Sequence, residues 1–237
     1  MKPSLPGMDP IPAEVVPEWQ KIFAAPRPGG CSVYPEIFEN GWLFPLQRMR
    51  ETEKMIDLAR TITPRVIVEI GSDKGGSFYH WIEGIPSVLK AIAIEIRGTP
   101  FADVFAAAFP DRRLLCIEES SYDPATVARV AAFLEGDAID CLFIDGDKCA
   151  FDRDFDAYLP MMRAGGIVFF HDIRDADNST ETFERLSRTY KHESIIDTSE
   201  YDAIAAREAA GIAPASSYEQ WFRIWKRRSC GVGVIYV

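Results

Sequence analysis

The stretch V-I-V-E-I-G-S-D-K-G-G-S, residues 66–77, joins an apolar run to a glycine-rich turn. Gly71, Gly75 and Gly76 allow the backbone to turn sharply and to approach a ligand closely. A segment of helical length follows, and the N-terminus of that helix would face the turn. The stretch therefore predicts a buried strand, a binding loop and a helix in direct succession.

Further short apolar runs follow and alternate with segments of helical length. Nearly continuous apolar content is typical of strands that are covered on both faces, as in parallel sheets. The clearest helical segment is P-A-T-V-A-R-V-A-A-F-L at 124–134, which opens with proline. This order predicts an α/β fold with a doubly wound, mostly parallel seven-stranded sheet. The expected strands are 66–70, 91–96, 113–117, 140–145, 166–171, 193–197 and 231–237.

Proline divides the chain into an arm and a domain. Nine of the sixteen prolines precede residue 46, so residues 1–45 are expected to form an irregular N-terminal arm around the outside of the domain. From Leu46 onward apolar residues recur at helical spacing until Pro64. Residues 46–237 are expected to form the main domain, with a helical insertion at about 198–230.

Composition excludes several classes of partner. The net charge of −10 repels a phosphate backbone, which argues against nucleic acid as a partner. The sequence has neither a signal peptide nor an apolar run of roughly 20 residues, so a cytoplasmic protein without a membrane span is expected. The five cysteines lack C-x-x-C spacing and are expected to be reduced thiols rather than a disulfide framework or a zinc site.

Charged residues follow the fourth apolar run in F-I-D-G-D-K, residues 143–148. Ligands of doubly wound sheets bind beyond the carboxyl ends of the strands, so Asp145, Asp147 and Lys148 are expected at the mouth of a binding site.

The helix expected after these residues also contains acids. Asp152 and Asp154 are expected on its solvent face, and the inner face is expected to carry Phe151, Phe155 and Tyr158.

The glycine-rich turn differs from that of dinucleotide-binding proteins. Asp73 stands where the second glycine of G-x-G-x-x-G would admit a pyrophosphate, and Glu69 is nearby. Two carboxylates suit a cationic ligand better than a diphosphate. Glu95 ends the second run, where an acid can accept hydrogen bonds from both ribose hydroxyls. An adenosine compound with a positive charge and no phosphate, such as S-adenosylmethionine, meets these conditions. The alternatives are that Glu69 caps a helix or forms a salt bridge and that Glu95 is a solvated strand end.

Taken together, four motifs resemble those of class I S-adenosylmethionine-dependent methyltransferases. They are E-I-G-x-x-x-G-G-S, the acid of A-I-E-I, F-I-D-G-D-K and G-G-I-V-F-F-H-D-I. D-G-D-K is similar to the D-A-D-K of metal-dependent O-methyltransferases that act on catechols and caffeoyl-CoA. The spacing from D-G-D to H-D and the segment Q-R-M-R-E-T-E-K resemble the cephalosporin hydroxylase-like group. The resemblance covers about residues 46–197 and the last strand, and it implies a Rossmann-like methyltransferase fold.

The resemblance also implies roles for individual residues. It places a divalent cation, magnesium or manganese, on Asp145, His171 and Asp172, and a catalytic base on Lys148, with its pKa lowered by the cation and by burial. The metal-dependent family usually has D-N at the position of His171 and Asp172. An alternative is that His171 bonds a loop, that Asp172 caps a helix and that Lys148 is a surface lysine. The implied cofactor contacts are Glu69, Gly71, Ser72, Gly75, Ser77, Glu95, Ser120 and Asp145.

The expected function is metal-assisted O-methylation of a hydroxyl on a small molecule such as a phenol, a sugar or a natural product. The expected setting is natural product biosynthesis. One alternative is a nicotinamide-dependent oxidoreductase on a Rossmann-type sheet. Another is a non-catalytic cofactor-binding scaffold. The apolar insertion also suggests a homo-oligomer.

Overall fold

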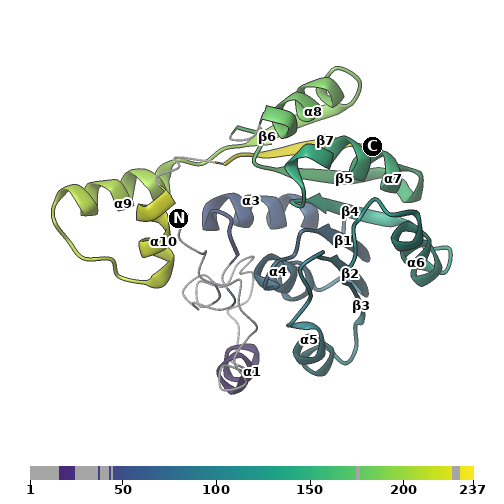
Figure 1. Ribbon diagram of the computed structural model, residues 1–237, viewed down its shortest axis with the longest axis horizontal. Helices are drawn as coiled ribbons and strands as arrows, with labels where there is room; N and C mark the ends of the chain where they lie inside the picture. The colour runs from purple at the N-terminus through teal and green to yellow at the C-terminus, as the bar shows by residue number, and fades with distance from the viewer. Residues whose placement is uncertain (1–15, 25–36, 38–42, 44, 175–176, 226–229) are drawn as a thin grey trace.

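The computed structural model describes residues 16–24, 37, 43, 45–174, 177–225 and 230–237. Its centre is a seven-stranded sheet with the order β3-β2-β1-β4-β5-β7-β6, in which β7 alone runs antiparallel to its neighbours (Figure 1). The predicted fold class is therefore confirmed. The strands are β1 (Val66–Ile70), β2 (Lys90–Ile94), β3 (Arg113–Ile117), β4 (Ile139–Ile144), β5 (Met162–His171), β6 (Lys191–Ile195) and β7 (Val232–Tyr236).

The central strands are largely apolar, with Glu69 of β1 and Asp140 of β4 as buried exceptions, and helices cover both faces of the sheet. Val68 of β1 pairs with Ile92 of β2 and with Leu142 of β4. Alternate residues of each strand enter two separate hydrophobic cores, as Ile67 and Val68 do. The period of two along each strand thus supplies apolar side chains to both layers.

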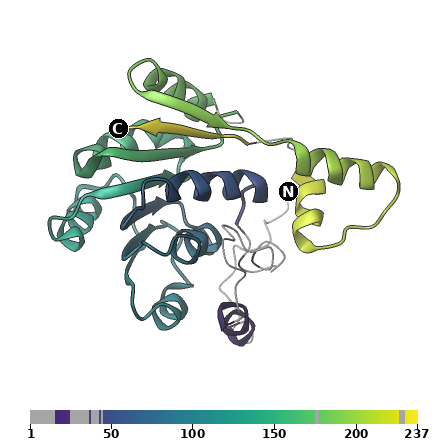
Figure 2. The ribbon, with the colours of Figure 1, turned by 180° about the vertical axis from the view of Figure 1, so that it is seen from behind.

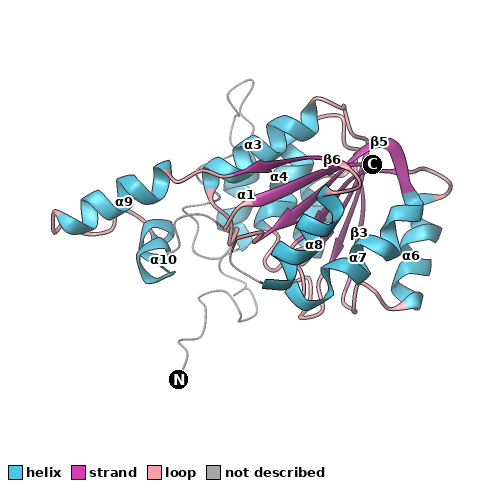
Figure 3. Cartoon of the chain, turned by 90° about the horizontal axis from the view of Figure 1, so that it is seen from above, coloured by secondary structure: helices cyan, strands magenta, loops and turns pink. Residues whose placement is uncertain are grey.

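The helices form two layers around this sheet (Figures 2 and 3). Helices α1, α3, α4 and α5 pack on one face, and α6, α7 and α8 pack on the other. Pro124 opens α6, and the Asp123 side chain caps it by accepting from Ala125 N at 2.8 Å. The helices are α1 (Val16–Ala24), α3 (Met49–Arg60), α4 (Gly76–Gly84), α5 (Ala102–Ala108), α6 (Pro124–Leu134), η1 (Lys148–Ala150), α7 (Phe151–Tyr158), η2 (Leu159–Met161) and α8 (Asp177–Ser187).

The insertion expected near 198–230 contains two helices, α9 (Ser199–Ala209) and α10 (Ser217–Trp225). They extend away from the sheet beyond β6 (Figures 1 and 3). The aromatic side chains of Tyr218, Trp221 and Phe222 pack with Leu46 and Met49. The insertion is therefore anchored to the segment that leads into α3.

Several expectations are wrong in detail, including the end of the second strand, which lies at Ile94 rather than at residue 96. Asp154 is fully buried in α7 rather than exposed, because Ser121 donates a hydrogen bond to its carboxyl group at 2.6 Å. The predicted exposure of Asp152 and burial of Phe151, Phe155 and Tyr158 are confirmed. The sixth strand ends at Ile195, two residues earlier than expected, because its pairing with β7 ends there.

Most of the proline-rich arm, including Cys31, lies outside the described residues. Its described helix α1 buries Trp19 in the core, where Phe23 stacks on Tyr79. Among the described residues, Cys116, Cys141 and Cys149 are free thiols. Among the described helices, none has the length and apolar character that crossing a bilayer requires.

Candidate active site

The candidate site lies where the sheet order reverses, beyond the carboxyl ends of β1 and β4. Gly71 N donates to Ile94 O of β2, and Asp145 N donates to Ile70 O, each at 2.8 Å. These bonds hold the loops after the strands side by side. A cavity of about 530 Å³ opens between the loops. Such a volume is in the range of small-molecule and cofactor sites.

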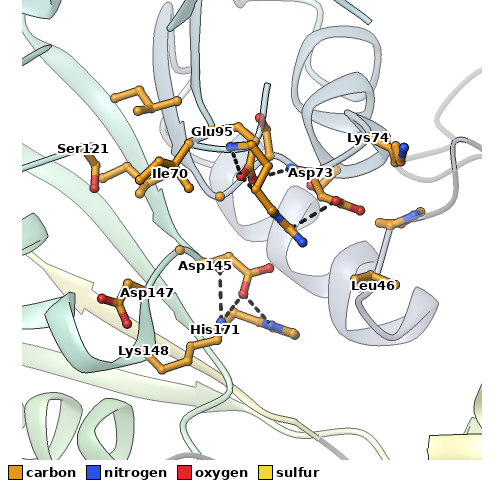
Figure 4. A pocket seen from close by; sticks show the side chains of 18 of the residues that line it. Leu46, Ile70, Asp73, Lys74, Glu95, Ser121, Asp145, Asp147, Lys148 and His171 are labelled. Carbon is orange, nitrogen blue, oxygen red and sulfur yellow. Dashed lines mark hydrogen bonds and ion pairs between the residues drawn. The ribbon is translucent and has the colours of Figure 1, made fainter. Parts of the chain in front are cut away.

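Nine of the residues predicted for the site line this cavity, and several of them are drawn in Figure 4. The structure thus brings together side chains that are up to about a hundred positions apart in the sequence. Glu69 and Gly75 are the two predicted residues that do not line the cavity. The nine lining residues are Gly71, Ser72, Ser77, Glu95, Ser120, Asp145, Lys148, His171 and Asp172.

Glycine is required at the turn by both conformation and space. Gly71 has φ +84°, and a Cβ there would lie 2.6 Å from the backbone of Asp145 and Gly146. Gly75 has φ +87°, and its Cβ would lie 2.7 Å from the Phe101 ring. The turn can therefore pack against the β4 loop only without a side chain at position 71, and against the Phe101 ring only without one at position 75.

The carboxylate of Glu95 stands on the cavity wall directly after β2. Its oxygens accept from Asp73 N and from Arg97 N, each at 3.0 Å. Arg97 also pairs with Asp73 at 3.2 Å, and half of its side chain is exposed. Glu95 is therefore fixed in place, with part of its hydrogen-bonding capacity satisfied by the loop itself.

Glu69 lies beneath the turn, where it is fully buried and accepts a short hydrogen bond from Ser77 Oγ. Burial raises the pKa of Glu69 well above its usual value. Its carboxyl group therefore supports the loop from below, and Ser77 forms the surface above it. Ser72 is also buried, and its hydroxyl has no hydrogen-bond partner among the described residues.

The opposite rim is formed after β3 by Ser120, Ser121 and Tyr122. Tyr158 OH donates to Ser121 O at 2.8 Å, and Ser121 Oγ donates to Asp154. Burial raises the pKa of Asp154 to about 7. This rim is thus positioned by buried side chains of α7.

Asp145, Lys148, His171 and Asp172 form a charged cluster at the ends of β4 and β5. Figure 4 labels the first three. The Lys148 ammonium forms a short ion pair with Asp145 and another with Asp172 at 3.1 Å. His171 Nδ1 lies 3.0 Å from Asp145 Oδ1 and 3.5 Å from Asp172 Oδ1. Two carboxylates and two basic groups therefore share one partly closed space.

The two carboxylates of the cluster raise the pKa of both basic members, Lys148 and His171. Burial lowers the pKa of Lys148, but the charges of Asp145 and Asp172 outweigh it and raise the pKa above the usual value. Burial likewise lowers the pKa of His171, and the same carboxylates outweigh it and raise the pKa to about 10. Burial thus acts on the Lys148 pKa in the expected direction, but the facing carboxylates outweigh it, and the expected effect of a bound cation stays a prediction.

Asp172 adopts a left-handed backbone conformation with φ +59°, which is uncommon outside glycine. Its carbonyl accepts from Ser179 Oγ of α8 at 2.7 Å, which fixes the turn after β5. Non-glycine residues held in this region cluster at functional sites. The turn directs the carboxylate of Asp172 toward Lys148 and His171.

Gln47 was not predicted for the site. It is buried in the turn before α3, and its Nε2 donates to Asp145 Oδ2 at 2.6 Å. Gln47 Oε1 has no hydrogen-bond partner in the described part of the chain. The segment Q-R-M-R-E-T-E-K, already noted for its resemblance, was the available signal for this contact.

Comparison with known proteins identifies the central part of the chain. Residues 68–173 match the family described as a methyltransferase domain. This part of the chain is a methyltransferase domain. The match includes the glycine-rich turn, Glu95 and the whole charged cluster, and it confirms the predicted enzyme class. No curated protein has a detectable sequence match to this chain.

Solved structures agree with this identification at the level of the fold. An O-methyltransferase from Bacillus cereus in complex with SAH has a TM-score of 0.57 at 13% identity, covering 96% of this chain and 92% of that one. TomG, an O-methyltransferase from Streptomyces achromogenes involved in tomaymycin synthesis, in complex with SAM, has a TM-score of 0.57 at 14% identity, covering 93% of this chain and 94% of that one. At such identities the likeness establishes the shared fold.

Proposed function

We propose that this methyltransferase domain transfers a methyl group from S-adenosylmethionine to a hydroxyl oxygen of a small molecule, with help from a divalent cation. The observation that carries the proposal is that one cavity contains both the glycine-rich turn and the Asp145–Lys148–His171–Asp172 cluster. The first is suited to hold an adenosine compound, and the second is suited to remove a proton beside it.

The cofactor half of the cavity has the chemistry of a cationic nucleoside site. Glu95 can accept hydrogen bonds from ribose hydroxyls. The buried hydroxyl of Ser72, which lacks a hydrogen-bond partner among the described residues, can donate to the amino-acid part of the ligand. Gly71 keeps the backbone surface free of side-chain atoms. Two basic residues, Lys74 and Arg97, line this part, and Arg97 is already paired with Asp73 and Glu95 among the described contacts.

The acceptor half lies between the β4 loop and the turn before α3. Pro45, Leu46 and Gln47 line the cavity there, and Gln47 donates a hydrogen bond to Asp145. Gln47 Oε1 can accept a hydrogen bond from an incoming hydroxyl, since no described residue uses it. Two apolar residues and one amide suit a ring or a ring-like natural product that carries a hydroxyl.

Lys148 is the proposed general base. As the hydroxyl oxygen bonds to the methyl carbon and the carbon–sulfur bond of the bound sulfonium breaks, the hydroxyl proton passes to Lys148 Nζ. The amine must first be neutral, whereas Asp145 and Asp172 favour its charged form. Neutralising one of these carboxylates would lower the pKa of Lys148 and so increase the fraction of neutral amine that can accept the proton.

A divalent cation would satisfy this requirement. Asp145, His171 and Asp172 are the proposed ligands, and His171 Nε2 is a buried nitrogen without a hydrogen-bond partner among the described residues. When bound, the cation would neutralise the carboxylates and lower the pKa of a hydroxyl that contacts it. The donor set therefore fits a metal, although the imidazole and the carboxylates already interact without one.

A transfer assay with methyl-labelled S-adenosylmethionine tests the proposal. Purified protein would be offered a panel of catechols, other phenols and sugars, with chelator, magnesium or manganese present. We expect labelled methyl ether and S-adenosylhomocysteine in equal amounts, with the yield depending on the added metal. Binding of the cofactor without transfer to any hydroxyl would contradict the proposed O-methylation.

A further inference from the structure

Cys230 lies beside the charged cluster although it is remote in sequence. The antiparallel pairing of β5 with β7 brings the two segments together, and Arg174 N donates to Cys230 O at 3.1 Å. The thiol is buried. One ligand atom each from Cys230, His171 and Asp172 lies within 4.8 Å of the other two.

Beside Cys230, the imidazole of His171 has one ring nitrogen without a hydrogen-bond partner among the described residues. Its Nδ1 faces Asp145 and Asp172, whereas Nε2 has no hydrogen-bond partner among the described residues. The imidazole is only 2% exposed, so water does not readily serve this nitrogen. A buried polar atom without a partner costs free energy, and a bound ligand would remove that cost.

We propose that Cys230 joins His171 and Asp172 in a site for a thiophilic divalent transition metal, of the class of zinc, iron(II) or cobalt(II), rather than for magnesium. This inference rests on the proposed function and deepens it, because it specifies the metal that assists the methyl transfer. Cys230 takes the ligand position given above to Asp145, which would instead keep its contact with His171 Nδ1. Thiolate and imidazole ligands favour these metals, whereas magnesium takes oxygen ligands and keeps several waters. Three protein ligands with an open position are also the usual arrangement of catalytic zinc.

The geometry and charge of the site suit such an ion. Metal bonds of about 2.0–2.3 Å would draw the three ligand atoms to roughly 3.5 Å from one another, which needs shifts on the order of 1 Å. A thiolate and one carboxylate together balance the charge of a divalent cation. Asp172 would use its carboxylate for this purpose while the strained turn at φ +59° holds its backbone.

Cysteine spacing along the sequence could not show this site, since its ligands come from two strands that pair only in the folded chain.

The test is a cobalt(II) titration of the chelator-treated full chain, followed by absorption spectroscopy in the absence of oxygen. We expect one equivalent to produce the intense near-ultraviolet thiolate-to-cobalt charge-transfer band. Cys230→Ser should remove the band and weaken zinc binding by more than the roughly 10–100-fold that loss of an outer-shell partner costs. Cys149→Ser is the matched control, because Cys149 is an exposed thiol next to Lys148 and should leave the band intact.

Several outcomes would overturn the proposal. They are no cobalt binding, binding without a charge-transfer band, an unchanged band in Cys230→Ser, and displacement of cobalt by a moderate excess of magnesium. Asp172→Asn provides a second variant, which should weaken cobalt binding while the band persists at saturation.

Calorimetric titration of S-adenosylmethionine into Cys230→Ser separates the two proposals. Retained cofactor binding with a lost band supports the metal site, whereas absent cofactor binding in wild type would contradict the proposed function alone.

Discussion

The side-chain amide of Gln47 donates a hydrogen bond to Asp145 Oδ2 at 2.6 Å, which joins the turn before α3 to the end of β4. The two residues are 98 positions apart. Asp145 therefore has three different partners, because Lys148 and His171 contact its other carboxylate oxygen. The orientation of this carboxylate depends on a segment outside the strands and the glycine-rich turn.

Replacing Gln47 tests this contact. Gln47→Met keeps the volume of the side chain but removes the donor, and a hydrogen bond to a charged group contributes about 1.5 kcal/mol or more. We expect methyl transfer to fall by about tenfold while the affinity for S-adenosylmethionine stays within about twofold. Steady-state kinetics and calorimetry measure the two effects. Unchanged turnover in a folded Gln47→Met protein would show that the contact does not serve catalysis.

Lys148→Met should remove the proposed base. A general base contributes about 10²–10⁴-fold to the rate, so turnover should fall by at least about 100-fold. Cofactor affinity should be nearly unchanged. Lys54→Met is the control, because Lys54 is an exposed lysine of α3 whose ion pair with Asp197 lies outside the cavity lining. If Lys148→Met retained full turnover, Lys148 would not be the base.

Gly71 and Gly136 separate backbone strain from close packing. Both have positive φ, +84° and +92°, but a Cβ at Gly136 meets no atom within 4 Å. Gly136→Ala should therefore cost only about 1–3 kcal/mol of stability, because only its backbone conformation is unfavourable. Gly71→Ala should cost more and should abolish cofactor binding, because its Cβ would collide with the β4 loop. Thermal unfolding and calorimetry compare the two, and equal behaviour would contradict the close packing of the loops.

Glu95→Gln should weaken S-adenosylmethionine binding by about tenfold. A carboxylate can accept hydrogen bonds at both oxygens, whereas the amide offers only one acceptor oxygen. The measurement is the dissociation constant from calorimetry. Glu184→Gln, on the exposed surface of α8, is the control. Equal affinity in Glu95→Gln would remove Glu95 from the proposed ribose site.

Asp154 should make stability depend on pH. Burial raises its pKa in the folded chain to about 7, compared with about 3.9 in the unfolded chain. Below about pH 4 both states hold the proton. Between about pH 4 and 7 only the folded state keeps it, so the contribution of Asp154 to the free energy of unfolding falls as the pH rises and is constant above about 7.

Asp154→Asn removes this titration while keeping the shape of the side chain. We expect the unfolding temperature of Asp154→Asn to match that of wild type near pH 4 and to exceed it at pH 8. Asp152→Asn, at an exposed position of the same helix, should follow wild type at both values. A constant difference between Asp154→Asn and wild type across this range would contradict the raised pKa of Asp154.

The sheet could be predicted because its information is local. Apolar runs such as V-I-V-E-I specify strands covered on both faces, and the rule that ligands bind at the carboxyl ends of strands then places Asp145 and Glu95 in one site. The same reasoning predicted Glu69 as a cofactor contact, whereas its side chain does not line the cavity. The alternation of strand residues directs that side chain beneath the turn, where it meets Ser77.

The remaining features depend on pairing between distant segments. Asp154 is buried because α7 packs beside Ser121. Periodicity along α7 alone assigned Asp152 and Asp154 to the same solvent face. Gln47 and Cys230 reach the cluster through the α3 turn and the antiparallel β7 strand. The charge of Lys148 depends on how many carboxylates face it, which composition cannot show.

Calorimetric titration of S-adenosylmethionine into the chelator-treated protein tests the central claim most directly. We predict a single site with micromolar affinity, absent in Gly71→Ala, and no comparable binding of nicotinamide dinucleotides. The absence of S-adenosylmethionine binding to the folded wild-type protein would contradict the assignment of the cavity as its site.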